Sequence, residues 1–341
     1  MIERYSRQEL FAPIGAEGQK KIMRKHVLII GAGALGTGNA EALVRAGVGK
    51  VTIVDRDYVE WSNLQRQQLY SEADAKERIP KAIAAKRRLE EVNSDVAIDA
   101  IVGDVTAQEL EELIAERKPD LLIDATDNFD IRMIINDAAY KYRIPWIHGA
   151  CVGSYGISYA FIPGKTPCFH CLLETVPVGG LTCDTAGIIS PAVQMVVAYQ
   201  VTEALKILVE DWAALRNKLV SFDLWKNQHT AIRIDQVKKE DCPTCGTHPL
   251  YPYLSYDQQT KTAVLCGRNS VQIRPAAPRN YNLQELAELF VKQGLSVDVN
   301  PYLVSVSLGE RRLVVFQDGR ALIHGTKDIQ EAKTIYYRYL G

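Results

Sequence analysis

Three glycines with a fixed spacing are the first residues in this sequence that point to chemistry. Gly31, Gly33 and Gly36 form the pattern Gly-x-Gly-x-x-Gly between an apolar run at 26–30 and a helical stretch. Glycine lets the backbone turn sharply and approach a phosphate group, and the following helix N-terminus supplies N–H donors. Asp55 lies at the end of the next apolar run, where a carboxylate can bind ribose hydroxyls. The pattern predicts a nucleotide site, although a tight packing turn without a ligand would have the same spacing.

The segment after Asp55 favours a triphosphate over a dinucleotide. Its sequence, DRDYVEWSNLQRQQLY, places a polar cluster just beyond the ribose carboxylate. The β- and γ-phosphates of a triphosphate need cations at such a position. We interpret Arg66 and Lys81 as phosphate clamps, and Asn63 as a hydrogen-bonding partner of phosphate or ribose oxygens. The alternative for each cation is an ordinary charge on a solvated loop.

A second acidic motif, DATDN at 124–128, follows the apolar run PDLLID. Ligands of open α/β sheets bind at the carboxyl ends of the strands. Asp127 is therefore placed to hold Mg²⁺ that bridges ATP phosphates, and Asn128 is placed to add a hydrogen bond. The alternative is that Asp127 caps the helix predicted at 129–142.

Four of the seven cysteines occur in two Cys-x-x-Cys pairs, Cys168 with Cys171 and Cys242 with Cys245. Thiolate is a strong zinc ligand, and four thiolates complete a tetrahedral structural site. Reduced packing thiols are the alternative, and a redox dithiol is disfavoured because neither pair is expected to open a helix after a strand. The pairs predict a structural zinc site with no open coordination position.

The elements that must position these residues alternate between strands and helices up to about residue 150. This alternation is typical of a Rossmann-like, doubly wound α/β sheet. A long apolar helix at 190–209 follows, and residues 219–237 predict a β-hairpin around Lys226 and Asn227. The expected strands are 26–30, 51–54, 96–101, 119–124 and 144–150, and the expected helices include 3–25, 79–93, 107–117 and 129–142.

The domain organisation follows from a change in composition after the second cysteine pair. We expect a first domain at 1–246 and a linker rich in proline and tyrosine at 247–262. A small α+β module of unknown role is expected at 263–341, in the order strand, helix, strand, strand, helix.

Overall composition excludes several classes of protein. Among 341 residues, 40 Lys and Arg against 41 Asp and Glu give a net charge of −1, which offers no general footprint for nucleic acid or an anionic membrane. No stretch reaches the ~18 apolar residues that span a bilayer, and the sequence MIERYSRQEL has no apolar signal core. We therefore expect a cytoplasmic protein that binds neither nucleic acid nor membrane.

Taken together, these motifs resemble those of the MoeB/ThiF family of adenylating enzymes, relatives of the ubiquitin-activating enzymes. The resemblance implies that ATP is used to adenylate the C-terminal Gly-Gly carboxylate of a ubiquitin-like sulfur carrier, MoaD-like or ThiS-like, with release of pyrophosphate, for molybdopterin or thiamine thiazole biosynthesis. It also implies the roles given above to the ATP-site residues. The matching segments are RYSRQ at 4–8, GAGALG at 31–36, VDRDYVEWSNLQRQ at 54–67, PK at 80–81, DATDN at 124–128, PCFHC at 167–171, LTCDTAG at 181–187 and CPTCG at 242–246.

The resemblance assigns two residues that the motifs alone do not. Arg7 matches an arginine that reaches the ATP site from the partner subunit, which implies a homodimer. Cys183 matches a cysteine that bonds covalently to the carrier in thiazole-pathway relatives but is dispensable for adenylation in molybdopterin-pathway relatives. Cys183 is therefore either a sulfur-relay residue or a bystander, and a sulfur donor such as a cysteine desulfurase or sulfurtransferase is a further expected partner.

Three alternative functions stay open at this point. One is a non-catalytic binding protein that retains the fold, although the intact Arg7, Arg66, Lys81 and Asp127 argue against such a loss of activity. Related adenylating enzymes act on a tRNA base or a peptide carboxylate instead of a sulfur carrier. The glycine turn alone would also fit an NAD-dependent oxidoreductase, although the SNLQRQ cluster, DATDN and the cysteine pairs argue against that class.

Overall fold

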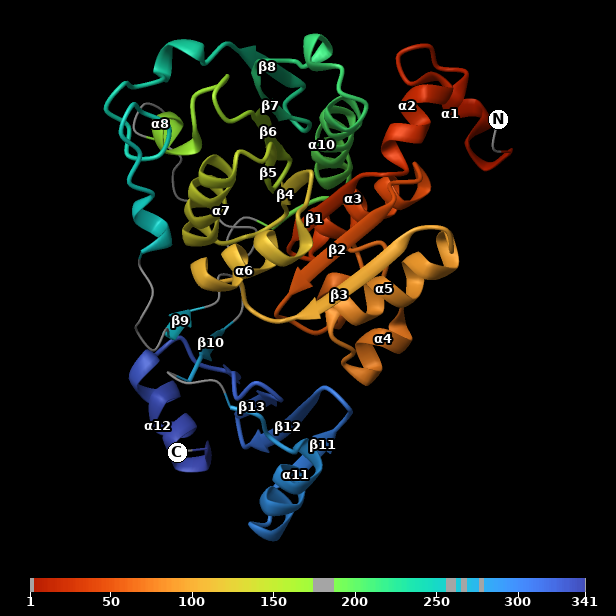
Figure 1. Cartoon of the computed structure of the whole chain (residues 1–341). Coiled ribbons are helices and arrows are strands. Elements are labelled where there is room, and N and C mark those ends of the chain that lie inside the picture. The colour runs from red at the N-terminus through yellow and green to blue at the C-terminus, as the bar shows by residue number, and fades with distance from the viewer. Residues whose placement is uncertain (1–2, 174–186, 256–261, 265–268, 276–278, 341) are drawn as a thin grey trace. The chain divides into compact units, whose positions relative to one another are not determined.

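The computed structural model describes residues 3–173, 187–255, 262–264, 269–275 and 279–340 (Figure 1). The chain divides into two compact units, Met1–Asp257 and Gln258–Gly341. The line between these units falls inside the segment interpreted as a linker at 247–262. Among the described residues, no helix combines the length and the apolar character that crossing a bilayer requires.

The first unit is built on an eight-stranded mixed sheet with the order β3-β2-β1-β4-β5-β6-β7-β8. Strands β3 to β5 in this order pair in parallel, and β5 to β8 pair antiparallel. The predicted doubly wound α/β sheet is therefore confirmed. The strands are β1 (His26–Ile30), β2 (Lys50–Asp55), β3 (Ala97–Val102), β4 (Leu121–Asp124), β5 (Trp146–Val152), β6 (Tyr155–Phe161), β7 (Leu219–Asp223) and β8 (Gln228–Ile232).

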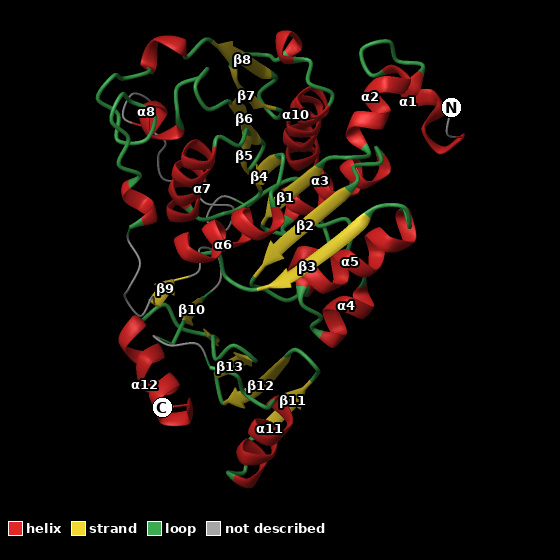
Figure 2. Ribbon diagram, in the orientation of Figure 1, coloured by secondary structure: helices red, strands yellow, loops and turns green. Residues whose placement is uncertain are grey.

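Helices cover both faces of this sheet and create two hydrophobic cores (Figure 2). Strand β1 shows why the runs are apolar throughout: Val27 and Ile29 face one core, and Leu28 and Ile30 face the other. The first core includes residues of α3 (Ala34–Arg45), α5 (Lys81–Val92) and α10 (Ser190–Leu208), and the second includes residues of α6 (Ala107–Arg117), α7 (Phe129–Tyr142) and α8 (Phe169–Leu173). The short helix α4 (Glu72–Glu77) precedes α5.

One local expectation in the first unit needs correction, and another is confirmed. The single helix expected at 3–25 is broken into α1 (Ser6–Glu9) and α2 (Gly15–Ile22). Pro13 between them cannot donate a backbone hydrogen bond, and Gly15 takes a φ of +57°. The hairpin expected at 219–237 does form, as β7 and β8, with Asn227 at a φ of +54° in its turn.

The second unit is an α+β module, as predicted, but it has more strands than expected. Its antiparallel sheet has the order β11-β12-β13-β14-β10-β9. Gly309 and Gly319 take φ values of +69° and +81°, and the tight turns at these glycines divide 303–324 into three strands. The elements are β9 (Thr262–Val264), β10 (Ser270–Ile273), α11 (Leu283–Lys292), β11 (Ser296–Val299), β12 (Leu303–Leu308), β13 (Arg311–Phe316), β14 (Ala321–His324) and α12 (Ile329–Leu340).

Candidate functional site

The glycine turn between β1 and α3 contains two glycines that the protein itself requires and one that it does not. Gly31 has a φ of +98°, and a Cβ added there would lie 2.5 Å from the carbonyl oxygen of Ala125. A Cβ at Gly36 would lie 1.9 Å from the carbonyl oxygen of Gly31. A Cβ at Gly33 would meet only Gln67 Nε2, at 4.0 Å. Gly33 therefore keeps open a space that the packing of the turn does not need.

The N-terminus of α3 lies at this open position. Gly33 is its N-cap residue and has no side chain to bond the first N–H groups of the helix. Uncapped N–H groups and the positive end of the helix dipole favour a negatively charged ligand. The turn can thus bind a phosphate group.

Asp55 lies at the end of β2, beside the glycine turn. Its Oδ2 accepts a hydrogen bond from Ala32 N at 2.6 Å, and its Oδ1 accepts one from Asp57 N at 2.7 Å. Burial raises the pKa of the Asp55 carboxyl, and the charge of Lys81 opposes that rise. Each carboxylate oxygen can accept more than one hydrogen bond, so Asp55 can hold the loop and still bind ribose hydroxyls.

Lys81, the first residue of α5, is joined to the same loop. Its Nζ lies 3.4 Å from Asp57 Oδ2, and its residue is only 4% exposed. The Tyr70 hydroxyl contacts the carbonyl oxygens of both Ala32 and Lys81, at 2.6 and 3.2 Å. Lys81 is therefore not an ordinary surface charge but a nearly buried cation beside the glycine turn.

Asn63 and Arg66 lie on the polar segment, where both are engaged in local hydrogen bonds. Asn63 is buried, and its Oδ1 accepts from Glu60 N at 3.1 Å. Arg66 Nη1 donates to the carbonyl oxygen of Ser62 at 2.8 Å. Gln67, which the motif reading passed over, is the buried side chain nearest to Gly33. Its Oε1 has no hydrogen-bond partner within the described part of the chain, which makes Gln67 a further candidate ligand-binding residue.

The buried carboxylate of Asp124 shapes the loop that follows β4. Its Oδ1 accepts hydrogen bonds from the N–H and hydroxyl of Thr126, at 3.0 and 2.7 Å. Its Oδ2 lies 2.7 Å from His148 Nδ1 and 3.3 Å from Arg132 Nε. Burial would raise the pKa of Asp124, but Arg132 and the bonds from His148 and Thr126 outweigh burial and lower it. Asp124 is therefore an ionised group that holds the loop from within.

The protonation of His148 follows from its surroundings. Burial lowers the pKa of the imidazole, although Asp124 acts in the opposite direction. At neutral pH His148 is accordingly uncharged and donates its Nδ1–H to the Asp124 carboxylate. The sequence gives no signal for this pair, because 24 residues separate its members.

Asp127 and Asn128 divide the roles that the motif left open. Asn128 is the N-cap of α7, and its Oδ1 accepts from Asp130 N at 2.9 Å. The alternative reading, in which Asp127 caps this helix, is wrong. Asp127 is exposed and lies within electrostatic reach of the Arg56 guanidinium. The carboxylate of Asp127 can therefore reach a ligand at the edge of the sheet.

Arg56 is a second residue that the motif reading missed. Its Nη1 lies 3.4 Å from Asp104 Oδ1. Burial opposes its charge, but Asp104, Asp57 and Asp127 outweigh burial and raise the pKa of Arg56. Arg56 thus adds a permanent cation to the region between Asp55 and Asp127.

The buried side-chain amide of Gln200 connects the end of β4 to the helix that follows the glycine turn. Gln200 on α10 donates from Nε2 to the carbonyl oxygen of Asp124 at 3.0 Å, and its Oε1 accepts from Asn39 Nδ2 on α3 at 2.8 Å. Gly149 on β5 lies so close that an added Cβ would be 2.5 Å from the Gln200 amide. Gln200 therefore fixes the helix of the glycine turn relative to the end of β4.

Of the two residues assigned by resemblance, only Arg7 lies in the part of the chain that the structure describes. Arg7 is exposed on α1, a few residues before Leu10 and Phe11, which are 62% and 60% exposed. Cys183 lies outside the described residues.

The four paired cysteines converge in the first unit. Sγ–Sγ distances are 3.5 Å between Cys168 and Cys242, 3.5 Å between Cys171 and Cys245, and 3.9 Å between Cys168 and Cys171. All four sulfurs lie within 4.8 Å of one another. A tetrahedral site with Zn–S bonds of ~2.3 Å places its sulfurs ~3.8 Å apart. The donor set and its spacing fit zinc.

The first cysteine pair lies at the start of a helix, which removes one objection to a redox role. Cys168 directly precedes α8, so the first pair does open a short helix, contrary to expectation. Phe169 N donates a hydrogen bond to Asn136 Oδ1 at 2.8 Å, and this bond stabilises the turn of the chain into α8. The convergence of the four thiols, and not the secondary structure around each pair, therefore supports a metal site.

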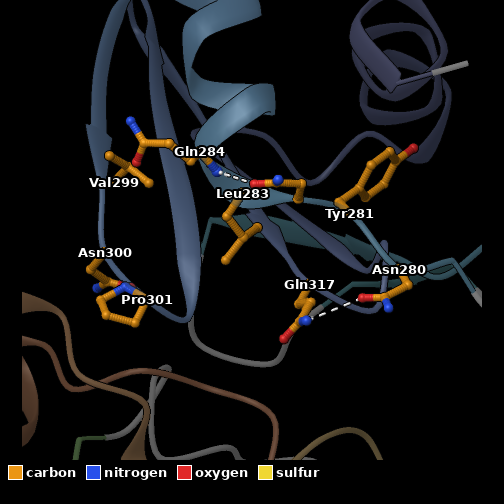
Figure 3. Close-up of a pocket in the computed structure, with 9 residues that line it drawn as sticks. Asn280, Tyr281, Leu283, Gln284, Val299, Asn300, Pro301 and Gln317 are labelled. Atoms are coloured by element: carbon orange, nitrogen blue, oxygen red, sulfur yellow. Dashed lines mark hydrogen bonds between the residues drawn. The ribbon is translucent and has the colours of Figure 1, made fainter.

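The second unit has a cavity of about 640 Å³ between the start of α11 and the end of β11 (Figure 3). Asn280 and Gln317 in its wall are joined by a 3.1 Å hydrogen bond, and Asn282 caps α11. None of the described residues that line it carries a carboxylate, a cation or a thiol; they are Asn280, Tyr281, Asn282, Leu283, Gln284, Val299, Asn300, Pro301 and Gln317. The residues that line this cavity therefore offer none of the charged groups that phosphate chemistry needs.

Comparison with known proteins now gives the family. A model of the ThiF family matches residues 5–244. The chain belongs to the ThiF family. The matched range contains every motif of the first unit up to Thr244 and none of the second unit.

Two of the relatives are named as adenylyltransferases. The chain is 57% identical over 341 residues, the full length of both proteins, to the Bacillus subtilis sulfur carrier protein ThiS adenylyltransferase. It is 32% identical over 244 residues, 71% of this chain and 96% of the relative, to the Escherichia coli molybdopterin-synthase adenylyltransferase. Escherichia coli MccB with ATP has a similar fold, with a TM-score of 0.61, 22% identity and coverage of 72% of this chain and 75% of that one.

The glycine turn leads to a paired prediction. Gly36→Ala is expected to destabilise the first unit by about 3 kcal/mol or more, because backbone atoms must move to admit the Cβ. Gly33→Ala has room and should change stability by only about 0.5 kcal/mol, yet it should weaken the stabilisation by Mg-ATP. Thermal unfolding with and without Mg-ATP measures both. Equal behaviour of the two variants would contradict the distinct roles assigned to these glycines.

Proposed function

We propose that this chain is an ATP-dependent adenylyltransferase that activates the C-terminal Gly-Gly carboxylate of a ubiquitin-like sulfur carrier. The observation that carries the proposal is the grouping of the glycine turn, Asp55, Lys81 and Asp127 around a common region at one edge of the first sheet. The chain is also 57% identical over its whole length to a protein named as a ThiS adenylyltransferase. We assign this activity to residues 1–246 and leave 263–341 without an assigned role.

The proposed reaction needs positioning of the two reactants and neutralisation of the phosphate charge more than it needs a protein nucleophile. A carboxylate oxygen of the carrier attacks the α-phosphorus of ATP, the bond from that phosphorus to the pyrophosphate oxygen breaks, and an acyl-adenylate and pyrophosphate form. The glycine turn and α3 bind phosphate oxygens, and Asp55 binds the ribose. Arg66 and Lys81 offset the charge that develops on the leaving pyrophosphate.

The residues of the two polar loops have narrower roles in this proposal. Asp127 would hold Mg²⁺, which supplies charge neutralisation at the phosphates when it is bound. Asn128 uses its Oδ1 to cap α7, so a bond to the nucleotide would come from its amide nitrogen. Asn63 likewise uses its Oδ1 within the loop, and Gln67 can add a contact next to Gly33.

Two observations favour a ThiS-like carrier over a MoaD-like one. Identity is 57% with the ThiS adenylyltransferase but 32% with the molybdopterin-synthase adenylyltransferase. The first match also includes the second unit, whereas the other covers 71% of the chain. A role for Cys183 in sulfur transfer would follow the ThiS-like assignment.

We also propose that the tetracysteine cluster holds a structural zinc ion. Four thiolates would occupy all positions of a tetrahedral ion, so no position would remain for a substrate. The spacing of the four sulfurs supports this proposal.

Carrier-dependent ATP–pyrophosphate exchange tests the proposed reaction. The full-length protein should catalyse exchange with a purified ThiS-like carrier and should do so more weakly or not at all with a MoaD-like carrier. Asp127→Asn should lower the exchange rate on the order of 10²-fold or more, because the charge on the phosphates loses its metal support. Asp130→Asn, on the first turn of α7, is the matched control. Wild-type exchange in Asp127→Asn would contradict the metal role, and exchange with neither carrier in a protein that binds ATP would favour a tRNA base or peptide carboxylate as the acceptor.

A homodimer in which Arg7 completes the ATP site of the other subunit is the last part of the proposal. Exposed Leu10 and Phe11 beside Arg7 supply apolar surface that a second copy could cover. Arg7→Ala and Asp127→Asn should each be inactive alone. A dimer of one subunit of each kind would have one complete site out of two, so random mixing in equal amounts should restore about a quarter of all sites. Absence of recovery, despite subunit exchange shown by mass spectrometry, would contradict action in trans.

A further inference from the structure

The second cysteine pair is joined to the chain segment that leads out of the first unit. The backbone N–H groups of Leu250 and Tyr251 both donate to the carbonyl oxygen of Pro243, at 2.8 and 3.0 Å. Pro243 lies between Cys242 and Cys245. Residues 250–254, named here the exit segment, therefore fold back directly onto one Cys-x-x-Cys loop.

The exit segment also contacts the first cysteine pair. The ring of Tyr253 packs edge-on against His170, with 6.4 Å between ring centroids. His170 lies between Cys168 and Cys171. Tyr251, Tyr253 and Leu254 pack against the second hydrophobic core. Both cysteine loops thus form part of the surface on which the exit segment lies.

Two adjacent side chains of α7 complete these connections. Asn136 Oδ1 accepts from Phe169 N, within the first cysteine loop, at 2.8 Å. Asp137 Oδ1 accepts from the Thr244 hydroxyl, within the second cysteine loop, at 2.6 Å. Asp137 Oδ2 accepts from Tyr253 N, in the exit segment, at 2.9 Å. One carboxylate therefore connects a cysteine loop and the exit segment.

Because Asp137 is buried, loss of either one of its two hydrogen bonds, to Thr244 or to Tyr253 N, is energetically costly. Its side chain is fully buried, and the Thr244 hydroxyl is buried beside it. A buried carboxylate that loses one hydrogen bond keeps its desolvation cost without the compensating contact. The positions of Thr244 and Tyr253 are therefore expected to change together and not independently.

We propose that Asp137 is a positioning residue that couples metal occupancy of the tetracysteine cluster to the placement of the exit segment. Thr244 lies between the two cysteines of the second pair, and its N–H donates to Cys242 Sγ at 3.5 Å. Its hydroxyl donates to Asp137, which also accepts from Tyr253 N. Outer hydrogen bonds of this kind typically change metal affinity 10- to 100-fold when they are removed. The coupling is reciprocal, because two sites that share one free energy affect each other equally. The inference rests on the proposed zinc site and not on the adenylation reaction.

Metal loss measures one direction of the coupling. Zinc content of the full-length protein is measured first, and release to the chelator 4-(2-pyridylazo)resorcinol is then followed over time. Thr244→Val removes only the hydroxyl and should speed release about 10- to 100-fold. Thr244→Ser keeps the hydroxyl and should release zinc at nearly the wild-type rate. Asp137→Asn should resemble Thr244→Val, and Asp130→Asn on the same helix should resemble wild type.

Limited proteolysis measures the other direction. Chymotrypsin cleavage at the Tyr253–Leu254 bond, mapped by mass spectrometry, should be slow in the zinc-loaded chain. Removal of zinc should speed it at least about tenfold, because cleavage follows the population of the opened segment. Zinc-loaded Thr244→Val should show faster cleavage at this bond as well, which separates release of the segment from general unfolding.

The outcomes separate this inference from the functions proposed above. Wild-type zinc release in both Thr244→Val and Asp137→Asn, or equal cleavage of loaded and stripped chains, overturns the coupling and leaves the zinc site intact. A folded preparation that catalyses carrier-dependent exchange without bound zinc contradicts both the metal proposal and the coupling, but not adenylation. A zinc-loaded protein without exchange activity contradicts the adenylation proposal, and faster zinc release from Thr244→Val in that protein would still support the coupling.

Discussion

The contact between two backbone turns, with no room for a side chain between them, is the constraint on which the first unit depends. Gly31, directly after β1, approaches the carbonyl oxygen of Ala125 after β4 so closely that an added Cβ would lie 2.5 Å from it. A Cβ added at Gly36 would lie only 1.9 Å from the carbonyl oxygen of Gly31, so the turn has no room for a side chain there either. Strands β1 and β4 are adjacent and parallel, with Ile30 opposite Asp124. The glycine turn and the loop that contains Asp127 consequently lie side by side after the ends of β1 and β4.

Buried polar groups hold these two loops from inside the sheet, and the groups expected to meet ligands range from the nearly buried Lys81 to the exposed Asp127. Asp124 and Gln200 bond the backbone from inside the sheet, and the bonds they make would each cost about 1–3 kcal/mol if one partner were removed. Asp127, by contrast, is exposed and takes no part in capping α7. Near the tetracysteine cluster, the buried Asp137 likewise holds a surface segment, because it joins Thr244 to Tyr253 of the exit segment.

The parts of this structure that the sequence predicts are those with local signals. The run at 26–30 is apolar throughout because both of its faces are covered, and the glycine spacing reports a turn whose atoms are neighbours in the chain. The pairs Asp124–His148 and Asp137–Thr244 join residues that are 24 and 107 positions apart, and no periodicity marks them. The second unit has more strands than expected, because Gly309 and Gly319 take left-handed backbone conformations in tight turns that divide 303–324 into three short strands. Gln67 and Arg56 lie inside a recognised motif, and only the folded geometry distinguishes them from their neighbours.

The central claim is that this edge of the sheet is built for a nucleoside triphosphate and not for a dinucleotide. The most direct measurement is the thermal unfolding of the full-length protein with increasing Mg-ATP or NAD. A ligand at 100 times its dissociation constant stabilises the folded state by about 2.7 kcal/mol. The account predicts a concentration-dependent rise in the unfolding temperature with Mg-ATP and none with NAD. Equal stabilisation by NAD, or no response to Mg-ATP in a folded protein, would contradict it.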